Sequence, residues 1–159
     1  RHMFIRDSCS NFNIKTLPQL KKKYIDTGKV QLEFIDYPLD RLAVIAATLA
    51  RSIPTKDGYV EAVSILLKKQ KQWAYSKNPL NELQSIAKLF GISSKKFNDI
   101  SQNIPLMQEI VTKMEEESKN FDINSTPTFI VNDKYKISGA LSFKDFEKEL
   151  LKSINAKKS

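Results

Sequence analysis

Cys9 is the most reactive side chain of this sequence and its only cysteine among 159 residues. A cysteine thiolate attacks disulfides and binds metals. His2 is the only histidine, and one cysteine with one histidine cannot furnish a closed zinc site. A Cys–His nucleophilic pair would depend on Arg1-His2-Met3, a stretch typical of a cloning remnant. Cys9 is therefore interpreted either as a redox thiol or as a buried residue that packs as a small apolar side chain.

Other polar patterns favour solvated surface over catalysis. Glu115, Glu116 and Glu117 occupy successive helix positions and point in different directions. With only four glycines, a phosphate-binding loop is excluded. The net charge of +8 comes mainly from scattered lysines. Because there is no arginine cluster and no aromatic platform, this charge predicts no nucleic-acid site. It does favour acidic partners or anionic membrane surfaces. We expect no metal, no cofactor and no membrane-spanning segment.

The second candidate feature is Thr126-Pro127, inside residues 124–131, where a short polar run passes directly into an apolar one. Proline has no N–H to donate to a sheet ladder and belongs at the first residue of a strand or at a sheet edge. The bond before a proline is also the one common site of a cis peptide. The pair therefore marks either the simple start of a strand or a cis-proline loop that leads into one.

The residues after the Thr-Pro pair predict a β-hairpin and a closing helix. Residues 128–131 form an apolar β-type run, Asn132-Asp133 is a turn pair, and residues 134–138 alternate as a half-buried strand does. Ser142, with Asp145 three positions later, resembles a capping box. We predict a helix from about Ser142 whose buried face carries Phe143, Phe146, Leu150, Leu151 and Ile154.

Upstream, residues 11–27 carry apolar side chains at helical spacing, and Pro18 inside this run should kink or restart the helix. Gly28 is a typical helix C-cap. Residues 29–37 then alternate between apolar and polar types, which predicts a strand. Its inward residues are expected to be Val30, Leu32, Phe34 and Ile35.

Residues 40–121 predict an almost wholly helical segment. No period of 20 to 50 residues recurs there, which excludes a helical solenoid. The chain is long enough, and at 41% hydrophobic apolar enough, to bury a core without metals or disulfides. We predict one α/β domain from residues 1–39 and 122–159 with a helical insertion at 40–121. The insertion's expected helices are 41–51, 58–73, 79–91, about 94–100 and 105–120.

This order of elements, together with several short matches, resembles the DsbA-like thiol-disulfide oxidoreductases of bacterial envelopes. The resemblance covers roughly residues 10–155, and the order and spacing of the matches are specific. The matching residues are Thr16-Leu17-Pro18 with Leu20 and Tyr24, Thr27-Gly28-Lys29-Val30, Tyr37-Pro38-Leu39-Asp40, Trp73, Ala87-Lys88-Leu89-Phe90-Gly91, Ser125-Thr126-Pro127-Thr128-Phe129 and Ser138-Gly139-Ala140.

The resemblance implies a thioredoxin-like fold with an inserted all-helical domain. It also implies that Pro127 is cis and that Thr126 lies beside a redox dithiol, where its backbone pairs with a bound substrate chain. In that family the dithiol is a Cys-x-x-Cys pair at the start of the first helix, where the helix N-terminus favours a thiolate. Counting back from Thr16, Cys9 falls at the second, buried cysteine and Arg6 at the attacking one. The predicted site is therefore catalytic Cys9 with substrate-binding Thr126 and Pro127.

The resemblance also predicts a central strand before the first helix, for which only residues 2–5 remain. We therefore expect the N-terminal strand to be truncated or altered. A strand supplied by another copy, through swapping or edge addition, is the alternative that would complete the sheet.

Two functions follow from these observations. The first is a periplasmic DsbA-like enzyme that acts on disulfides of exported cysteine-containing proteins, with a membrane redox partner; this chain would lack its first cysteine and be inactive as a dithiol enzyme. The second is a redox-inactive relative that keeps the groove beside Thr126-Pro127 and binds peptides as a chaperone-like module. The native sequence at this end of the chain would distinguish them, because a cysteine two residues before Ser8, where this sequence has Arg6, supports the enzyme and its absence supports the binder.

Overall fold

The structure is a computed structural model that describes residues 8–156. The chain divides into two compact units, of which unit 1 is Arg1–Phe34 with Glu117–Ser159 and unit 2 is Ile35–Glu116. The structure places the two boundaries after residues 34 and 116. The sequence predicted them after residues 39 and 121, five residues further along the chain in each case. Whether each unit is an independent domain stays a prediction.

Unit 1 begins, in its described part, with a helix that is interrupted by π-helical turns. Residues 8–11 are α-helical, and the π-turns Phe12–Thr16 and Lys21–Ile25 flank the α-helical turn α2, Leu17–Leu20. Pro18 lies in α2, where it has no N–H for the helical ladder. The preceding turn is widened accordingly, because the Leu17 N–H donates to the Phe12 carbonyl five residues back. The predicted disturbance at Pro18 is therefore confirmed.

The prediction of a strand at residues 29–37 is wrong. Its exposure does alternate, with Val30, Leu32 and Phe34 half-buried and the residues between them exposed. Ile35, expected to point inward, is exposed. A strand requires a ladder with a neighbouring backbone, and among residues 8–156 the sheet consists of two other strands only.

Those two strands form the predicted hairpin. β1, Thr128–Val131, pairs antiparallel with β2, Tyr135–Ser138. Three residues, Asn132 to Lys134, connect them, because Val131 pairs with Tyr135. Asn132 and Asp133 have left-handed φ of 52° and 56°, and the Lys134 N–H donates to the Val131 carbonyl at 3.2 Å, which closes a turn around these two residues. In this register Phe129 lies opposite the buried Ile137.

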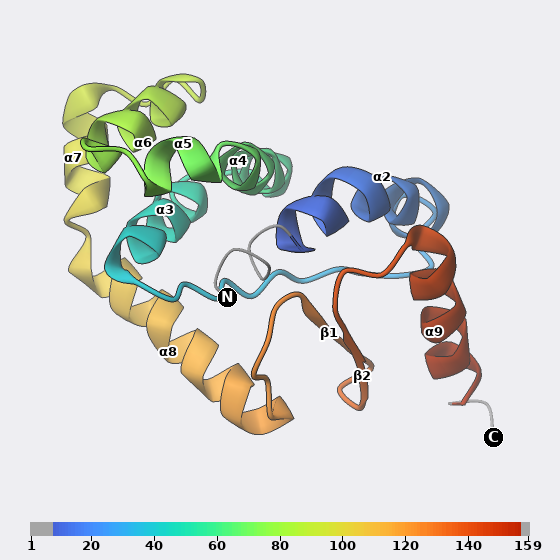
Figure 1. Cartoon of the computed structure of the whole chain (residues 1–159). Helices are drawn as coiled ribbons and strands as arrows, with labels where there is room; N and C mark the ends of the chain where they lie inside the picture. The colour runs from blue at the N-terminus through green and yellow to red at the C-terminus, as the bar shows by residue number, and fades with distance from the viewer. Residues whose placement is uncertain (1–7, 157–159) are drawn as a thin grey trace. The chain divides into compact units, whose positions relative to one another are not determined.

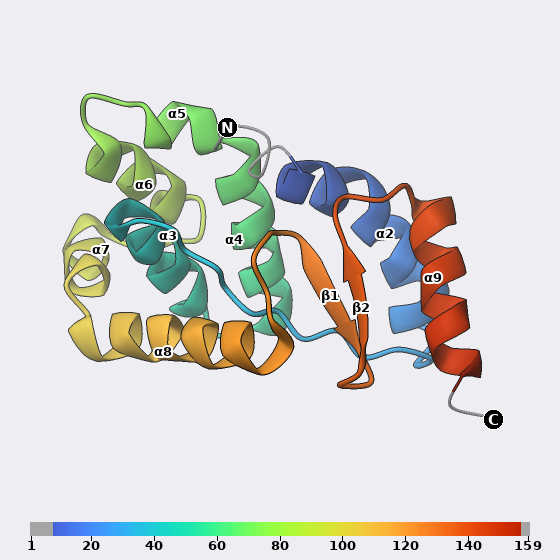
Figure 2. The same ribbon diagram turned by 60° about the horizontal axis from the view of Figure 1, so that its bottom comes forward.

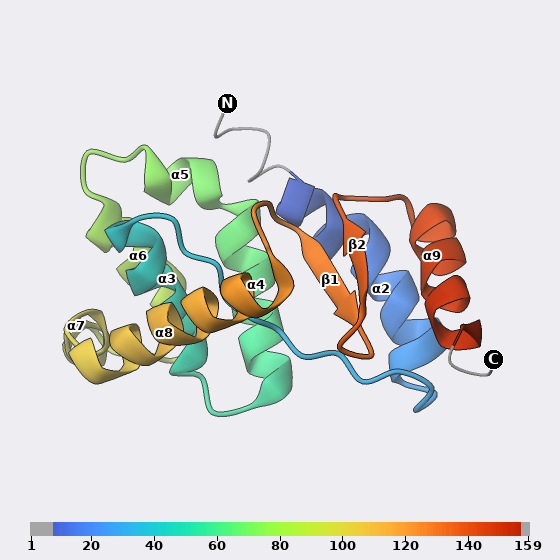
Figure 3. The same ribbon diagram turned by 90° about the horizontal axis from the view of Figure 1, so that it is seen from below.

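The last helix, α9 (Phe143–Asn155), lies beside α2, and both pack on the same face of the hairpin (Figures 2 and 3). Its predicted cap is confirmed, because the Ser142 hydroxyl oxygen accepts the Asp145 N–H at 3.2 Å. Phe146 and Leu150 are buried as predicted, but Leu151 is 41% exposed. Leu151 follows Leu150 by 100° around the helix, which turns it away from the hairpin.

A polar group also ties the first helix to α9. The Tyr24 hydroxyl and the Lys23 ammonium both donate to the Glu147 carboxylate, and we call these three residues the Glu147 cluster. The two donors hold the pKa of Glu147 below its ordinary value, the Lys23 hydrogen bond contributing most.

All of the regular secondary structure in unit 2 is helical, as predicted. Figure 1 shows α3 surrounded by α4, α6 and α7, in agreement with their contacts. Leu49 and Leu83 are fully buried in this core. The predicted helix 58–73 is two helices that break at Lys69. The helices are α3 Arg41–Arg51, α4 Lys56–Lys68, α5 Gln70–Ala74, α6 Pro79–Lys88, α7 Ser94–Ser101 and α8 Ile104–Phe121, the last of which runs into unit 1.

Candidate functional site

Unit 1 brings Cys9 and Thr126 into contact, although they lie near opposite ends of the sequence. Cys9 is half-buried on the first helical residues that the structure describes. Thr126 lies in the loop between α8 and β1, and its side chain is close enough to Cys9 to act as a hydrogen-bond partner that lowers the pKa of the thiol. The structure therefore joins two of the three predicted site residues directly.

The surroundings of Cys9 act on its thiol in opposite directions. Burial raises the pKa of the Cys9 thiol above its ordinary value, because the thiolate is poorly solvated there. Hydrogen bonding by the Thr126 side chain opposes this effect, because it stabilises the thiolate. Burial has the larger effect, so the thiol form of Cys9 predominates at neutral pH.

Pro127 follows Thr126 through a cis peptide bond, which is the geometry that the resemblance implies. The loop around this bond is held by two hydrogen bonds. The Thr128 hydroxyl donates to the Ser125 carbonyl at 2.6 Å, and the Gly139 N–H donates to the Pro127 carbonyl at 2.9 Å. Thr126 lies between these anchored neighbours, half-buried beside Cys9.

Three phenylalanines fix the elements that carry the site. Phe12 is on the helix of Cys9, Phe129 is on β1 two residues after Pro127, and Phe146 is on α9. Their ring centroids are separated by 4.5 Å (Phe12–Phe129), 5.5 Å (Phe12–Phe146) and 4.8 Å (Phe129–Phe146). Tilted and edge-to-face pairs of this kind stabilise a core beyond their buried area. The three phenylalanines, called the Phe cluster below, thus hold the first helix against the strand that follows Thr126-Pro127.

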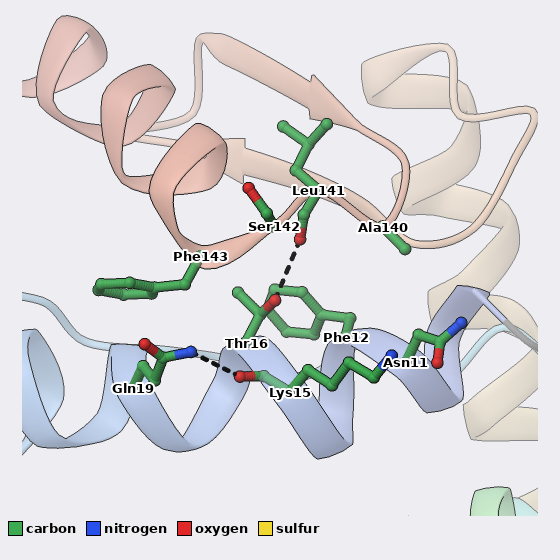
Figure 4. Close-up of a pocket in the computed structure, with 9 residues that line it drawn as sticks. All are labelled: Asn11, Phe12, Lys15, Thr16, Gln19, Ala140, Leu141, Ser142 and Phe143. Carbon is green, nitrogen blue, oxygen red and sulfur yellow. Dashed lines mark hydrogen bonds between the residues drawn. The ribbon is translucent and has the colours of Figure 1, made fainter.

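A recess of about 320 Å³ lies in unit 1 close to these residues. One wall is the first helix between Asn11 and Gln19, and the other is the segment Ala140–Phe143 that leads into α9 (Figure 4). Asn11 follows Cys9 by two positions, which is within one helical turn. Ala140 follows Gly139, the residue that pairs with Pro127. The recess therefore extends from the neighbourhood of both predicted site segments.

Thr16 joins the two walls of the recess, a role that was not predicted from its place in the sequence. Its hydroxyl donates to the Leu141 carbonyl at 3.0 Å (Figure 4), and the residue is only 3% exposed. The available signal was a threonine on the apolar face of a helix, since a buried hydroxyl needs a hydrogen-bond partner. Its partner could not have been named from the sequence.

The remaining candidates are placed only in part. Arg6 and His2 lie outside the described residues, so the position opposite Cys9 in a Cys-x-x-Cys pair is not defined by the structure. Within residues 8–156 no three histidine, cysteine or acidic side chains gather as metal ligands would. In the same range no helix is both long and apolar enough to cross a bilayer.

Comparison with known proteins identifies the family. The family model described as Thioredoxin matches residues 7–152. The crystal structure of alpha-DsbA1 from Wolbachia pipientis superposes with a TM-score of 0.80 and 27% identity, covering 94% of this chain and 82% of that one.

Two curated relatives agree with this match. A Rickettsia typhi protein named "Putative protein-disulfide oxidoreductase" is 28% identical over 124 residues, which are 78% of this chain and 46% of that protein. The thiol:disulfide interchange protein DsbA of Buchnera aphidicola is 25% identical over 117 residues, which are 73% of this chain and 53% of that protein. The chain thus spans about half the length of these relatives.

The fold expected from the sequence, a thioredoxin-like fold with a helical insertion, is confirmed by these matches. The chain therefore belongs to the thioredoxin family, and within that family it is similar to DsbA proteins.

Proposed function

We propose that this protein performs thiol–disulfide exchange on exported cysteine-containing proteins in the bacterial periplasm. The observation that carries the proposal is the position of the Thr126 side chain, close enough to Cys9 to act as a hydrogen-bond partner, next to Pro127. A polar donor on a half-buried thiol stabilises the thiolate, which is the species that attacks or leaves in exchange. A membrane redox partner that restores the redox state belongs to the same proposal, as does association of copies through an added strand.

Cys9 can carry out one half of an exchange by itself. Its thiolate attacks a substrate disulfide, a bond forms between the Cys9 sulfur and one substrate sulfur, and the other substrate sulfur leaves as a thiolate that takes up a proton. No further cysteine exists in these 159 residues, so the mixed disulfide would persist. In a Cys-x-x-Cys pair, Cys9 would instead resolve a mixed disulfide formed at the position of Arg6.

The main chain of Thr126 is suited to hold the substrate. Within residues 8–156, the Thr126 N–H and C=O pair with no other backbone group, and Thr126 and Pro127 are only half-buried. An extended peptide can therefore pair with Thr126 as a strand pairs with a sheet edge. This would bring a substrate sulfur towards Cys9, while side chains of the same peptide enter the recess.

The first experiment tests Cys9 alone. Incubated with glutathione disulfide, the chain should acquire one glutathione on Cys9, detectable by mass spectrometry, and the Cys9→Ser variant should acquire none. A folded chain whose Cys9 stays unmodified at alkaline pH would contradict a redox role for this thiol.

The second experiment restores the pair. The variant Arg6→Cys should form an internal disulfide and accelerate the oxidation of a reduced two-cysteine peptide by glutathione disulfide. The chain itself and the double variant Arg6→Cys/Cys9→Ser should not accelerate it. A folded Arg6→Cys variant that forms the disulfide but leaves the peptide rate unchanged would refute the enzyme reading.

A second candidate function, a redox-inactive peptide-binding module, is favoured by the single cysteine. It predicts that a cysteine-free unfolded peptide binds the chain and the Cys9→Ser variant with equal affinity. Binding that requires Cys9, or no binding at all, would remove this candidate. Fluorescence anisotropy of a labelled peptide measures the affinity.

A further inference from the structure

The position of Thr126 on Cys9 needs an explanation, because Thr126 has no backbone anchor of its own. Within the described residues, its N–H and C=O pair with no backbone group. Its side-chain contact with Cys9 must therefore be maintained by the residues on either side of it. Loops without such support sample many conformations, and a side-chain hydrogen bond is then populated only part of the time.

Both neighbours of Thr126 are anchored, but in different ways. On the C-terminal side, the Pro127 carbonyl accepts the Gly139 N–H at 2.9 Å, which extends the hairpin ladder by one bond. On the N-terminal side, the Ser125 carbonyl accepts the Thr128 hydroxyl at 2.6 Å. The hydroxyl of Thr128 thus reaches back over Thr126-Pro127 and closes a short ring around the two residues.

Thr128 is itself well fixed. It is the first residue of β1, where it lies opposite Ser138. Its side chain is β-branched, so few χ1 rotamers are open to it. The hydroxyl is therefore a pre-oriented donor, and little additional entropy is lost when it holds the Ser125 carbonyl.

We propose that Thr128 is a positioning residue for Cys9, because its hydroxyl holds the Ser125 carbonyl and thereby keeps the Thr126 hydroxyl on the Cys9 sulfur. This inference rests on the proposed function, in which Cys9 is the exchanging thiol. When the Thr128 hydroxyl is removed, Thr126 loses its support on one side. The thiolate of Cys9 then loses its donor for part of the time and becomes harder to form.

The test measures the reactivity of Cys9 in the full chain. The variant Thr128→Val keeps the β-branched shape but lacks the hydroxyl, Thr128→Ser keeps the hydroxyl, and Thr126→Val removes the donor itself. The rate of alkylation of Cys9 by iodoacetamide, followed from pH 6 to pH 11, yields both the rate at a given pH and the midpoint of the titration. Circular dichroism establishes that each variant is folded.

We expect Thr126→Val to slow alkylation near neutral pH by about three- to tenfold, the effect of one net hydrogen bond. Thr128→Val should slow it in the same direction and shift the midpoint to higher pH, whereas Thr128→Ser should match the unaltered chain. The double variant Thr126→Val/Thr128→Val should be no slower than Thr126→Val alone, because Thr128 acts through Thr126.

Three outcomes would overturn the inference. They are an unchanged titration midpoint in Thr128→Val, a Thr128→Ser variant as slow as Thr128→Val, and effects of Thr126 and Thr128 that add in the double variant. If Thr128→Val does not fold, Thr128→Ser against Thr128→Ala makes the same comparison of hydroxyl with no hydroxyl. The proposed function fails separately, when Cys9 does not form a mixed disulfide with glutathione even in the unaltered chain.

Discussion

The Phe cluster permits a quantitative prediction about what holds the site together. Phe146 makes two aromatic pairs, with centroid distances of 5.5 Å to Phe12 and 4.8 Å to Phe129. Phe146→Leu removes both pairs but keeps most of the apolar burial. Each pair contributes about 0.5–1.5 kcal/mol beyond its area. We therefore expect Phe146→Leu to lower the free energy of unfolding by about 1–3 kcal/mol.

A double-mutant cycle isolates the shared pair. Phe12→Leu also removes two pairs, of which one is the pair with Phe146. The double variant therefore removes three different pairs, whereas the two single variants together count four. Its loss of stability should be smaller than the sum of the single losses by about 0.5–1.5 kcal/mol, the value of one pair.

Urea unfolding followed by circular dichroism measures these free energies. Leu151→Ala is the matched control, since Leu151 is on the same helix but 41% exposed, and it should change stability by no more than about 0.5 kcal/mol. Additive effects of Phe12→Leu and Phe146→Leu would show that the rings do not stabilise one another. A cost for Leu151→Ala equal to that of Phe146→Leu would refute the assignment of the core face of α9.

Three further predictions concern other parts of the chain. Gly58→Ala should lower the midpoint of thermal unfolding, at a cost in the free energy of unfolding of about 1–3 kcal/mol. The reason is that the added Cβ would lie 2.5 Å from the Ile53 Cγ2 atom and 2.7 Å from the Thr55 Oγ1 atom. A higher midpoint would show that the better helix propensity of alanine prevails over these contacts. Asp133→Gly should raise the free energy of unfolding by about 0.5 kcal/mol, because φ of 56° at this position strains any residue with a Cβ; a loss of stability in urea would contradict this. Glu147 has a pKa below its ordinary value in the folded chain, so the Glu147 cluster stabilises the fold above the pKa of the unfolded state and loses this contribution as the pH falls through the folded pKa. Glu147→Gln should accordingly flatten the decline of the thermal midpoint between pH 6 and pH 3, and an unchanged decline would exclude this carboxylate as its source.

Local chemistry in the sequence was sufficient for features that depend on a few neighbouring residues. The Asn132-Asp133 turn, the cap at Ser142 and the disturbed helix at Pro18 were all predicted, and each is confirmed. Turns, caps and proline effects arise from backbone geometry and hydrogen bonds within a few positions. Such features can therefore be recognised before the fold is known.

Two of the wrong predictions needed a partner from elsewhere in the chain. Residues 29–37 have the alternation of a strand, yet the structure assigns them no ladder. Leu151 has a spacing compatible with the buried face of α9, yet it is exposed. A pattern indicates which side of an element is apolar, but the neighbouring element decides how much of that side is covered.

The sequence by itself determined the inventory of the candidate site: one reactive thiol at Cys9, one Thr-Pro loop at residues 126–127, and the elements that carry them. Only the tertiary structure decided that the Thr126 side chain is a hydrogen-bond partner of Cys9 and that Thr16 joins the helix to Leu141. These contacts join residues more than a hundred positions apart. They exist because the Phe cluster packs the first helix against β1 and α9, and such packing depends on the shapes of side chains from three elements at once.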